Sequence, residues 1–122
     1  MKIAVPADDR SMAASVCISF GRAPYFLIYD TDAQKSSFIE NSAANNHSGA
    51  GVAAAQTIVD SGAEVLLTPR CGENAAEVIK AGNIELYKTF NGTLQENINV
   101  FLEGKLPALL EIHEGHHGHG GK

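Results

Sequence analysis

Residues 50 to 87 alternate between helical patterns that end at a glycine and short apolar runs, and this alternation limits the possible folds more than any other feature. Each helical pattern leads into an apolar run that is too short for a helix but sufficient for a buried strand. A strand, a helix and a second strand in this order form a parallel crossover, which is right-handed in nearly all proteins. The stretch therefore predicts part of an α/β sheet, with helices at 50–61 and 73–81 and strands at 64–68 and 84–87.

The first forty residues predict three further strands, which lie at 3–7, 24–29 and 35–40. A short turn at 31–33 separates the last two, so we expect them to form a hairpin. Residues 8–23 are polar or small and form a long loop, and loops of this length in compact domains are usually functional or mobile. A hairpin followed by strand-helix-strand units predicts a mixed sheet with helices on both faces.

A third helix is expected to begin after Thr93, because Thr93 and Glu96 have the spacing of a capping box. Gly104 ends this helix, so residues 1–104 are predicted to be a single α/β domain. Residues 105–122 are predicted to be a C-terminal extension with a flexible tail rich in glycine and histidine.

Composition excludes several classes of function. The 122 residues carry a net charge of −5, and the basic residues are scattered, so no nucleic-acid surface is expected. No run of 18 apolar residues is present, and the N-terminus lacks the pattern of a signal peptide, so we expect no membrane span and a cytoplasmic location. The two cysteines are expected to be free thiols in that compartment.

Both cysteines lie within a few residues of an arginine and a glycine. One such turn holds Cys17, Gly21 and Arg22, and the other is Arg70-Cys71-Gly72. The similar composition of the two turns suggests one site built from two loops. Glycines also precede both of the central helices, where free N–H groups and the helix dipole favour an anion. The candidate residues for binding an anionic cofactor are Gly21, Arg22, His47, Gly49, Gly51, Arg70 and Gly72.

Thiolate and imidazole groups suit copper, iron or zinc, whereas arginines suit an anion. A site that combines them, with no dense carboxylate cluster, indicates a metal-containing anion more than a bare cation. The alternatives of buried structural cysteines and of glycines that serve only tight turns remain open. The candidate metal ligands are Cys17, His47 and Cys71, together with His113, His116, His117 and His119 of the tail.

An enzymatic interpretation has less support in the sequence. Cys71 and His47 could form a nucleophile and its base, and Asp8 and Asp9 could hold a metal ion at a strand end. No nucleotide-binding fingerprint follows either glycine turn. We therefore expect a binding protein without catalytic residues, and a metal-dependent phosphodiesterase or metal storage through the tail is the alternative.

Residues 20–26 read Phe-Gly-Arg-Ala-Pro-Tyr-Phe, and residues 28–30 read Ile-Tyr-Asp. This pattern resembles the dinitrogenase iron–molybdenum cofactor biosynthesis family, of the orange-protein-like and NifX/NifB C-terminal type. The resemblance extends to the opening residues 1–6, to 49–55 and to Gly82-Asn83-Ile84, and it covers about residues 1–104. It implies a ribonuclease H-like motif, a three-layer α/β/α fold with a five-stranded mixed sheet.

The resemblance also implies that the chain binds or carries an anionic metal–sulfur cluster containing molybdenum, iron or copper. Its partners would then be the metallocofactor and the proteins that donate or accept it. Two departures lie in the loops: Ser19 stands where relatives often have histidine, and Cys71 lies in a turn that often lacks cysteine. The oligomeric state is left open by the sequence.

Overall fold

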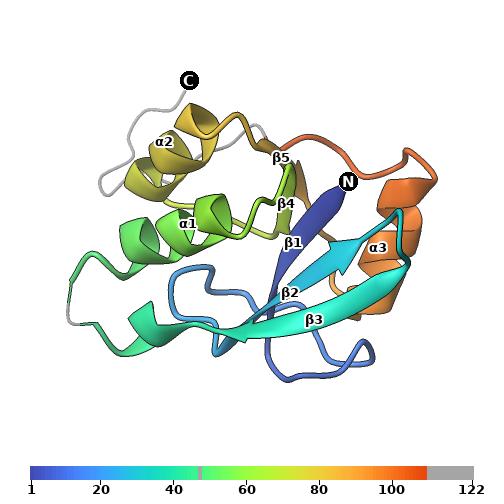
Figure 1. Cartoon of the computed structure of the whole chain (residues 1–122), viewed down its shortest axis with the longest axis horizontal. Coiled ribbons are helices and arrows are strands. Elements are labelled where there is room, and N and C mark those ends of the chain that lie inside the picture. The colour runs from blue at the N-terminus through green and yellow to red at the C-terminus, as the bar shows by residue number, and fades with distance from the viewer. Residues whose placement is uncertain (47, 110–122) are drawn as a thin grey trace.

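The computed structural model describes residues 1–46 and 48–109, and within them the chain forms a five-stranded sheet between two helical layers (Figure 1). The sheet order is β3-β2-β1-β4-β5, with β1 in the centre. β1 pairs antiparallel with β2 and parallel with β4, so the predicted mixed sheet is confirmed. The strands are β1 (Lys2–Ala7), β2 (Tyr25–Asp30), β3 (Lys35–Glu40), β4 (Val65–Thr68) and β5 (Glu85–Lys88).

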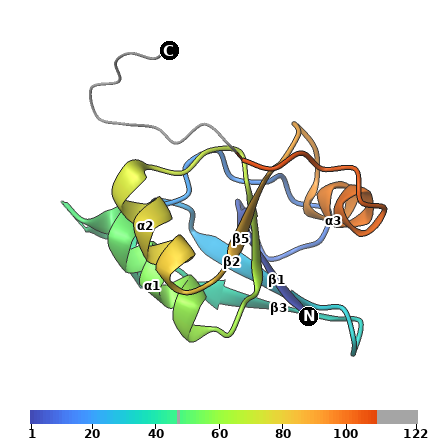
Figure 2. The same cartoon turned by 90° about the horizontal axis from the view of Figure 1, so that it is seen from above.

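The helices divide between the two faces of the sheet. Figure 2 shows α1 and α2 together on one side and α3 alone on the other. A short 3₁₀ helix, η1 (Ser42–Asn45), connects β3 to the segment before α1. The predicted helices all form, as α1 (Ala50–Asp60), α2 (Glu73–Ala81) and α3 (Leu94–Leu102).

Two cores result, because side chains alternate between the faces of a strand. On β1, Ile3 and Val5 pack toward α3, in a core that includes Leu94 and Ile98. The intervening Ala4 packs in the other core with Ile58 and Ile79 of α1 and α2. Alanines are frequent in this second core, namely Ala54, Ala55, Ala75 and Ala76.

Residues 105–109 continue from the domain onto the outer edge of β5. The amide of Lys88 donates to the carbonyl of Pro107 at 2.8 Å, and the amide of Leu109 donates to the carbonyl of Leu86 at 3.1 Å. Leu106 belongs to the core on the α3 side and Leu109 to the core on the opposite side. The first part of the predicted extension therefore covers a sheet edge, and residues 110–122 lie outside the described residues.

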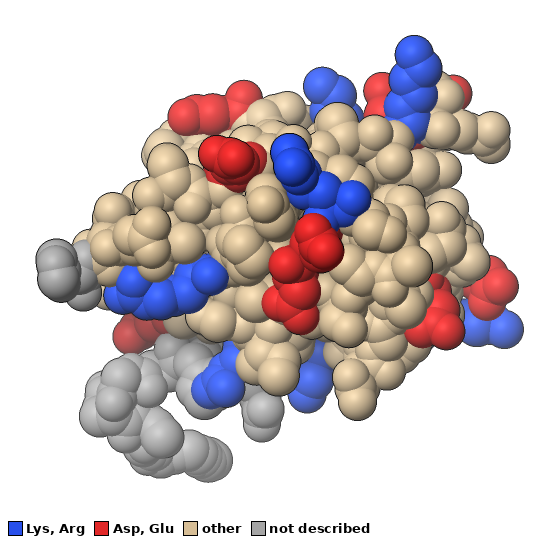
Figure 3. Space-filling model, turned by 90° about the horizontal axis from the view of Figure 1, so that it is seen from below, with Lys and Arg blue, Asp and Glu red and all other residues tan. Residues whose placement is uncertain are grey.

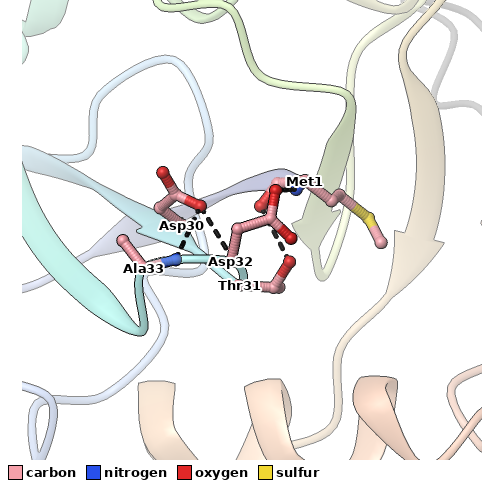
Figure 4. Close-up of polar contacts among 5 residues, drawn as sticks. All are labelled: Met1, Asp30, Thr31, Asp32 and Ala33. Carbon is pink, nitrogen blue, oxygen red and sulfur yellow. Dashed lines mark hydrogen bonds and ion pairs between the residues drawn. The ribbon is translucent and has the colours of Figure 1, made fainter.

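The turn between β2 and β3 is tied to the N-terminus (Figure 4). Asp30 accepts hydrogen bonds from the amides of Asp32 at 2.9 Å and Ala33 at 3.3 Å. Those two amides hold the pKa of the Asp30 carboxyl below its ordinary value of 3.8, Ala33 having the larger effect. The terminal amine of Met1 lies 3.2 Å from the carboxylate of Asp32. The turn joins β2 to β3 beside the start of β1, where Lys2 pairs with Asp30. Its hydrogen bonds therefore serve to hold the hairpin to the N-terminus.

Candidate functional site

A pocket of about 580 Å³ lies where the loop before β2 meets the N-terminal turns of α1 and α2. Three separate segments contribute to it, and two of them are the glycine-containing turns that the sequence predicts to form one site. The pocket is lined by Ile18, Ser19, Phe20, Gly21, Gly49, Ala50, Gly51, Val52, Arg70, Cys71, Gly72, Glu73, Asn74 and Ala75.

The N-terminus of α1 reaches the pocket through Gly49. This residue is the N-cap and has a left-handed backbone, with φ of 71°, which favours glycine. Among the described residues, no side chain accepts a hydrogen bond from the first turn of α1. The first amides of a helix have no partner within the helix, so those of α1 are left to meet the pocket.

The N-terminus of α2 is open for a different reason. Gly72 is its N-cap with φ of −68° and ψ of 161°, an extended conformation that any residue adopts. A Cβ atom built on Gly72 would meet no described atom within 4 Å. Neither the backbone nor the packing therefore requires glycine here, and a serine or aspartate would cap the helix better. Glycine at this position leaves the helix end accessible from the pocket.

The third helix provides an internal comparison. The hydroxyl of Thr93 accepts from the amide of Glu96 at 3.1 Å, and the carboxylate of Glu96 accepts from the amide of Thr93 at 2.9 Å. The predicted capping box is therefore confirmed. The chain caps the helix that lies away from the pocket and leaves uncapped, within the described residues, the two that point into it.

The wall between the loop and α1 depends on two glycines in direct contact. A Cβ atom on Gly21 would lie 3.0 Å from both the Cα and the N of Gly51. These are backbone atoms of the first turn of α1, and they cannot move aside as a flexible side chain can. Gly21 thus allows the Phe20-Gly21 turn to lie directly against the helix, where both segments line the pocket.

The two predicted arginines have different positions. Arg70 lines the pocket, as Glu73 of α2 does, and the hydroxyl of Thr68 donates to the carbonyl of Arg70 at 2.9 Å. Arg22 is outside the pocket lining, and its Nη1 donates to the carbonyls of Ala44 at 2.8 Å and Asn46 at 2.6 Å. The structure therefore brings one arginine to the pocket and uses the other to hold the segment before α1.

Both cysteines are buried members of the core on the α1 and α2 side. Cys71 is 1% exposed and contributes to the pocket lining, and Cys17 is 9% exposed and outside the lining. The pKa of each thiol is raised from 9.0 to about 11, mainly by burial, with a smaller contribution from Asp8 at Cys17. The Sγ atom of Cys17 donates to the carbonyl of Ser19 at 3.5 Å. Both thiols are thus protonated near neutral pH, whereas metal ligation requires thiolate.

The raised pKa values predict that stability falls as the pH rises from 9 to 11. In this interval the unfolded chain loses thiol protons that the folded chain retains, so unfolding is favoured by up to about 1.4 kcal/mol per pH unit for each thiol. Urea unfolding of the wild type and of a Cys17→Ala, Cys71→Ala variant at several pH values measures the effect. A wild-type slope no steeper than that of the variant would contradict it.

Other predicted ligands are not brought together within residues 1–46 and 48–109. No group of three or more His, Cys, Asp or Glu side chains there is arranged to hold a metal ion. Asp8 and Asp9 follow β1 and are exposed. The histidines His47, His113, His116, His117 and His119 all lie outside the described residues, so their assignment stays a prediction.

Several pocket residues were not predicted from the sequence. Ile18 is 68% exposed and Val52 is 40% exposed, and both line the pocket although they are aliphatic. Ile18 could have been noticed in the sequence, because it is a large aliphatic residue inside a polar loop. Glu73 and Asn74 were expected only as the first residues of the helix at 73–81, and nothing in the sequence indicated that they line a pocket.

On the face drawn in Figure 3, acidic and basic residues are interspersed and form no continuous basic patch of the kind that binds nucleic acid. Within the described residues, no helix is long and apolar enough to cross a bilayer.

The fold and the pocket together define an α/β domain in which two helix N-termini meet at one pocket. The chain belongs to the dinitrogenase iron–molybdenum cofactor family, whose model matches residues 1–104. Membership of this family associates the chain with the binding or biosynthesis of metal-cluster cofactors.

Solved structures agree with this assignment. The apo form of the orange protein from Desulfovibrio gigas is 31% identical, with a TM-score of 0.85 over 89% of this chain and 92% of that one. A Thermotoga protein provisionally named NifB is 35% identical, with a TM-score of 0.82 over 94% and 98% of the two chains. An uncharacterized protein of Methanocaldococcus jannaschii is 33% identical over 87% of this chain and 89% of its own length.

Proposed function

We propose that this protein binds an anionic metal–sulfur cluster in the pocket between the loop before β2 and the starts of α1 and α2, and that it carries the cluster rather than converts it. The observation that supports this most directly is the pair of uncapped helix N-termini, at Gly49 and Gly72, on one pocket. Their amides and dipoles favour negative charge without a covalent bond to the protein.

The size and lining of the pocket fit a cluster better than a small ion. A volume of about 580 Å³ lies within the range of pockets that hold ligands of many atoms. The aliphatic side chains of Ile18 and Val52 at the pocket favour a weakly hydrated, sulfide-rich surface over a strongly hydrated oxyanion. Arg70 adds a positive charge, and Glu73 adds a negative one that limits how tightly an anion is held.

The residues present thus suit electrostatic binding more than thiolate ligation. Cys17 lies outside the pocket lining, and Cys71 is only 1% exposed, so neither thiol is presented openly to a ligand in the pocket. We propose that the amides of the two helix ends, with Arg70, hold the cluster, and that molybdenum with iron or copper is the metal content.

Anaerobic reconstitution tests the proposal. The apo protein is mixed with tetrathiomolybdate and Cu(I), separated from free reagents, and measured by visible absorbance and by elemental analysis for Mo, Cu and S. We expect stoichiometric uptake by the full chain and also by a Cys17→Ser, Cys71→Ser variant. Failure of the full chain to retain molybdenum, with iron–sulfur reagents also tried, would reject the cluster-binding function.

A truncation after Leu109 separates the pocket from the histidine tail. Uptake that is unchanged in the truncated chain supports the pocket, whereas uptake that disappears favours metal storage through the tail. The phosphodiesterase alternative has less support, since within the described residues no group of three or more His, Cys, Asp or Glu side chains is arranged to hold a metal ion. Assays of phosphodiester cleavage with Mg²⁺ or Mn²⁺ are expected to show no activity above background.

A further inference from the structure

The segment before β2 and the segment after β3 are joined by two polar side chains that cross between them in opposite directions. Arg22 Nη1 donates to the carbonyls of Ala44 and Asn46, at 2.8 and 2.6 Å. Asn41 Nδ2 donates in return to the carbonyls of Gly21 and Ala23, at 3.1 and 2.8 Å. Four carbonyls, two on each segment, are thus bound by two side chains.

Asn41 is well suited to this position. It is 6% exposed, and its side-chain oxygen also accepts from the amide of Ala43 at 3.1 Å, where it caps η1. Its amide and its oxygen are therefore both bonded to the backbone, which fixes the side chain in one orientation. Its own backbone amide donates to the carbonyl of Pro24 at 3.1 Å.

The joined segments lead directly to the pocket. Gly21, whose carbonyl Asn41 holds, touches the backbone of Gly51 in the first turn of α1. Ala44 and Asn46, whose carbonyls Arg22 holds, lie in the segment that leads to Gly49. The four hydrogen bonds therefore act next to both walls of the pocket, the Phe20-Gly21 turn and the start of α1.

We propose that Arg22 and Asn41 form a clamp that positions the walls of the cluster pocket, so that Arg22 acts on ligand affinity through the position of Gly49 and Gly51 and not as a direct contact of the anion. This inference rests on the proposed function for its effect on binding. Its structural part, the rigidity of the wall, holds or fails in the apo protein without any ligand.

Hydrogen exchange on the apo protein tests the structural part. The amides of Ala44, Asn46 and Ala53 bond to the carbonyls of Asn41, Ala43 and Gly49, and they report opening of the wall. In Arg22→Ala we expect these amides to exchange about 10- to 100-fold faster, the effect of losing hydrogen bonds from a charged donor, while amides of β1 keep their rates. Unchanged rates at all three amides would overturn the clamp.

A double-mutant cycle on binding tests the functional part, with tetrathiomolybdate and Cu(I) as the probe and bound absorbance as the readout. Arg22→Ala and Asn41→Ala are each expected to weaken binding about tenfold, and the double variant to lose little more than either, because both act through one unit. Asn41→Ser replaces Asn41→Ala if the latter does not fold. Gln56→Ala, which removes a surface bond to Asp60 of 2.9 Å on α1, is the control with unchanged binding.

The outcomes distinguish failure of the clamp from failure of the proposed cluster-binding function. Losses that add fully would show that Arg22 and Asn41 act independently of each other, and this would overturn the proposal. Unchanged binding in both single variants would also overturn it while leaving the proposed function intact. If the wild type binds no cluster, the proposed function fails, and hydrogen exchange alone decides whether the clamp holds the wall.

Discussion

Replacement of Gly72 by aspartate is expected to weaken cluster binding strongly while making the protein slightly more stable. Gly72 is the N-cap of α2 in an extended conformation, with open space where a side chain would extend. An aspartate there can cap the first amides of α2 and complement the helix dipole, which stabilises the fold by a few tenths to about 1 kcal/mol. The same carboxylate occupies the place of the ligand.

The expected loss of affinity is about 30- to 1000-fold, since an added negative charge within a few Å of the bound anion costs about 2–4 kcal/mol at the edge of a protein. Equilibrium titration of Gly72→Asp with the thiomolybdate probe measures it, and urea unfolding measures the stability. Thr93→Asp is the matched control, because it places the same charge at the N-cap of α3, away from the pocket. Equal affinity in Gly72→Asp and the wild type would exclude the start of α2 from the site.

The second large effect concerns the contact between Gly21 and Gly51. Gly21→Ala is expected to lower the free energy of unfolding by about 1–3 kcal/mol, because the new methyl group would lie 3.0 Å from two backbone atoms of α1. The Phe20-Gly21 turn must then move away from α1, which also weakens ligand binding. Denaturant unfolding and probe titration measure the two losses.

Gly51→Ala is the matched comparison from the other side of the contact. Its Cβ would meet only the Cβ of Ala75, at an ordinary 3.5 Å, so no described atom needs to move. Alanine also stabilises a helix relative to glycine by about 0.5–1 kcal/mol. We therefore expect Gly51→Ala to be neutral or stabilising, and a Gly21→Ala variant as stable as Gly51→Ala would contradict the close approach.

The secondary structure was largely predictable, because its signals are local. The capping box of Thr93 and Glu96 marks the start of α3 within a few residues of sequence, and Gly62 has a left-handed φ of 82° just beyond α1. The alternation of helical patterns and short apolar runs gave the order of elements and the mixed sheet. The pairing of residues 106–109 with β5 was not predicted, since it depends on contacts across about twenty residues.

The site was predictable only in part, for the same physical reason. The two glycine turns do line one pocket, and this was inferred from their shared composition. The bonds of Arg22 to Ala44 and Asn46 join residues 22 and 24 positions apart, and no spacing in the sequence indicates them. The burial of Cys17 and Cys71 likewise depends on how α1 and α2 pack on the sheet.

The two cores on opposite faces of the sheet separate the sources of stability from the site of binding. The core beneath α3 contains large side chains such as Leu27, Leu67, Leu94 and Ile98, and it does not contribute to the pocket. Substitutions that destabilise the pocket walls can therefore be compensated by tighter packing on the far face. The residues that line the pocket can therefore change without loss of the scaffold, and α3 is where an engineer should add stability before redesigning the pocket.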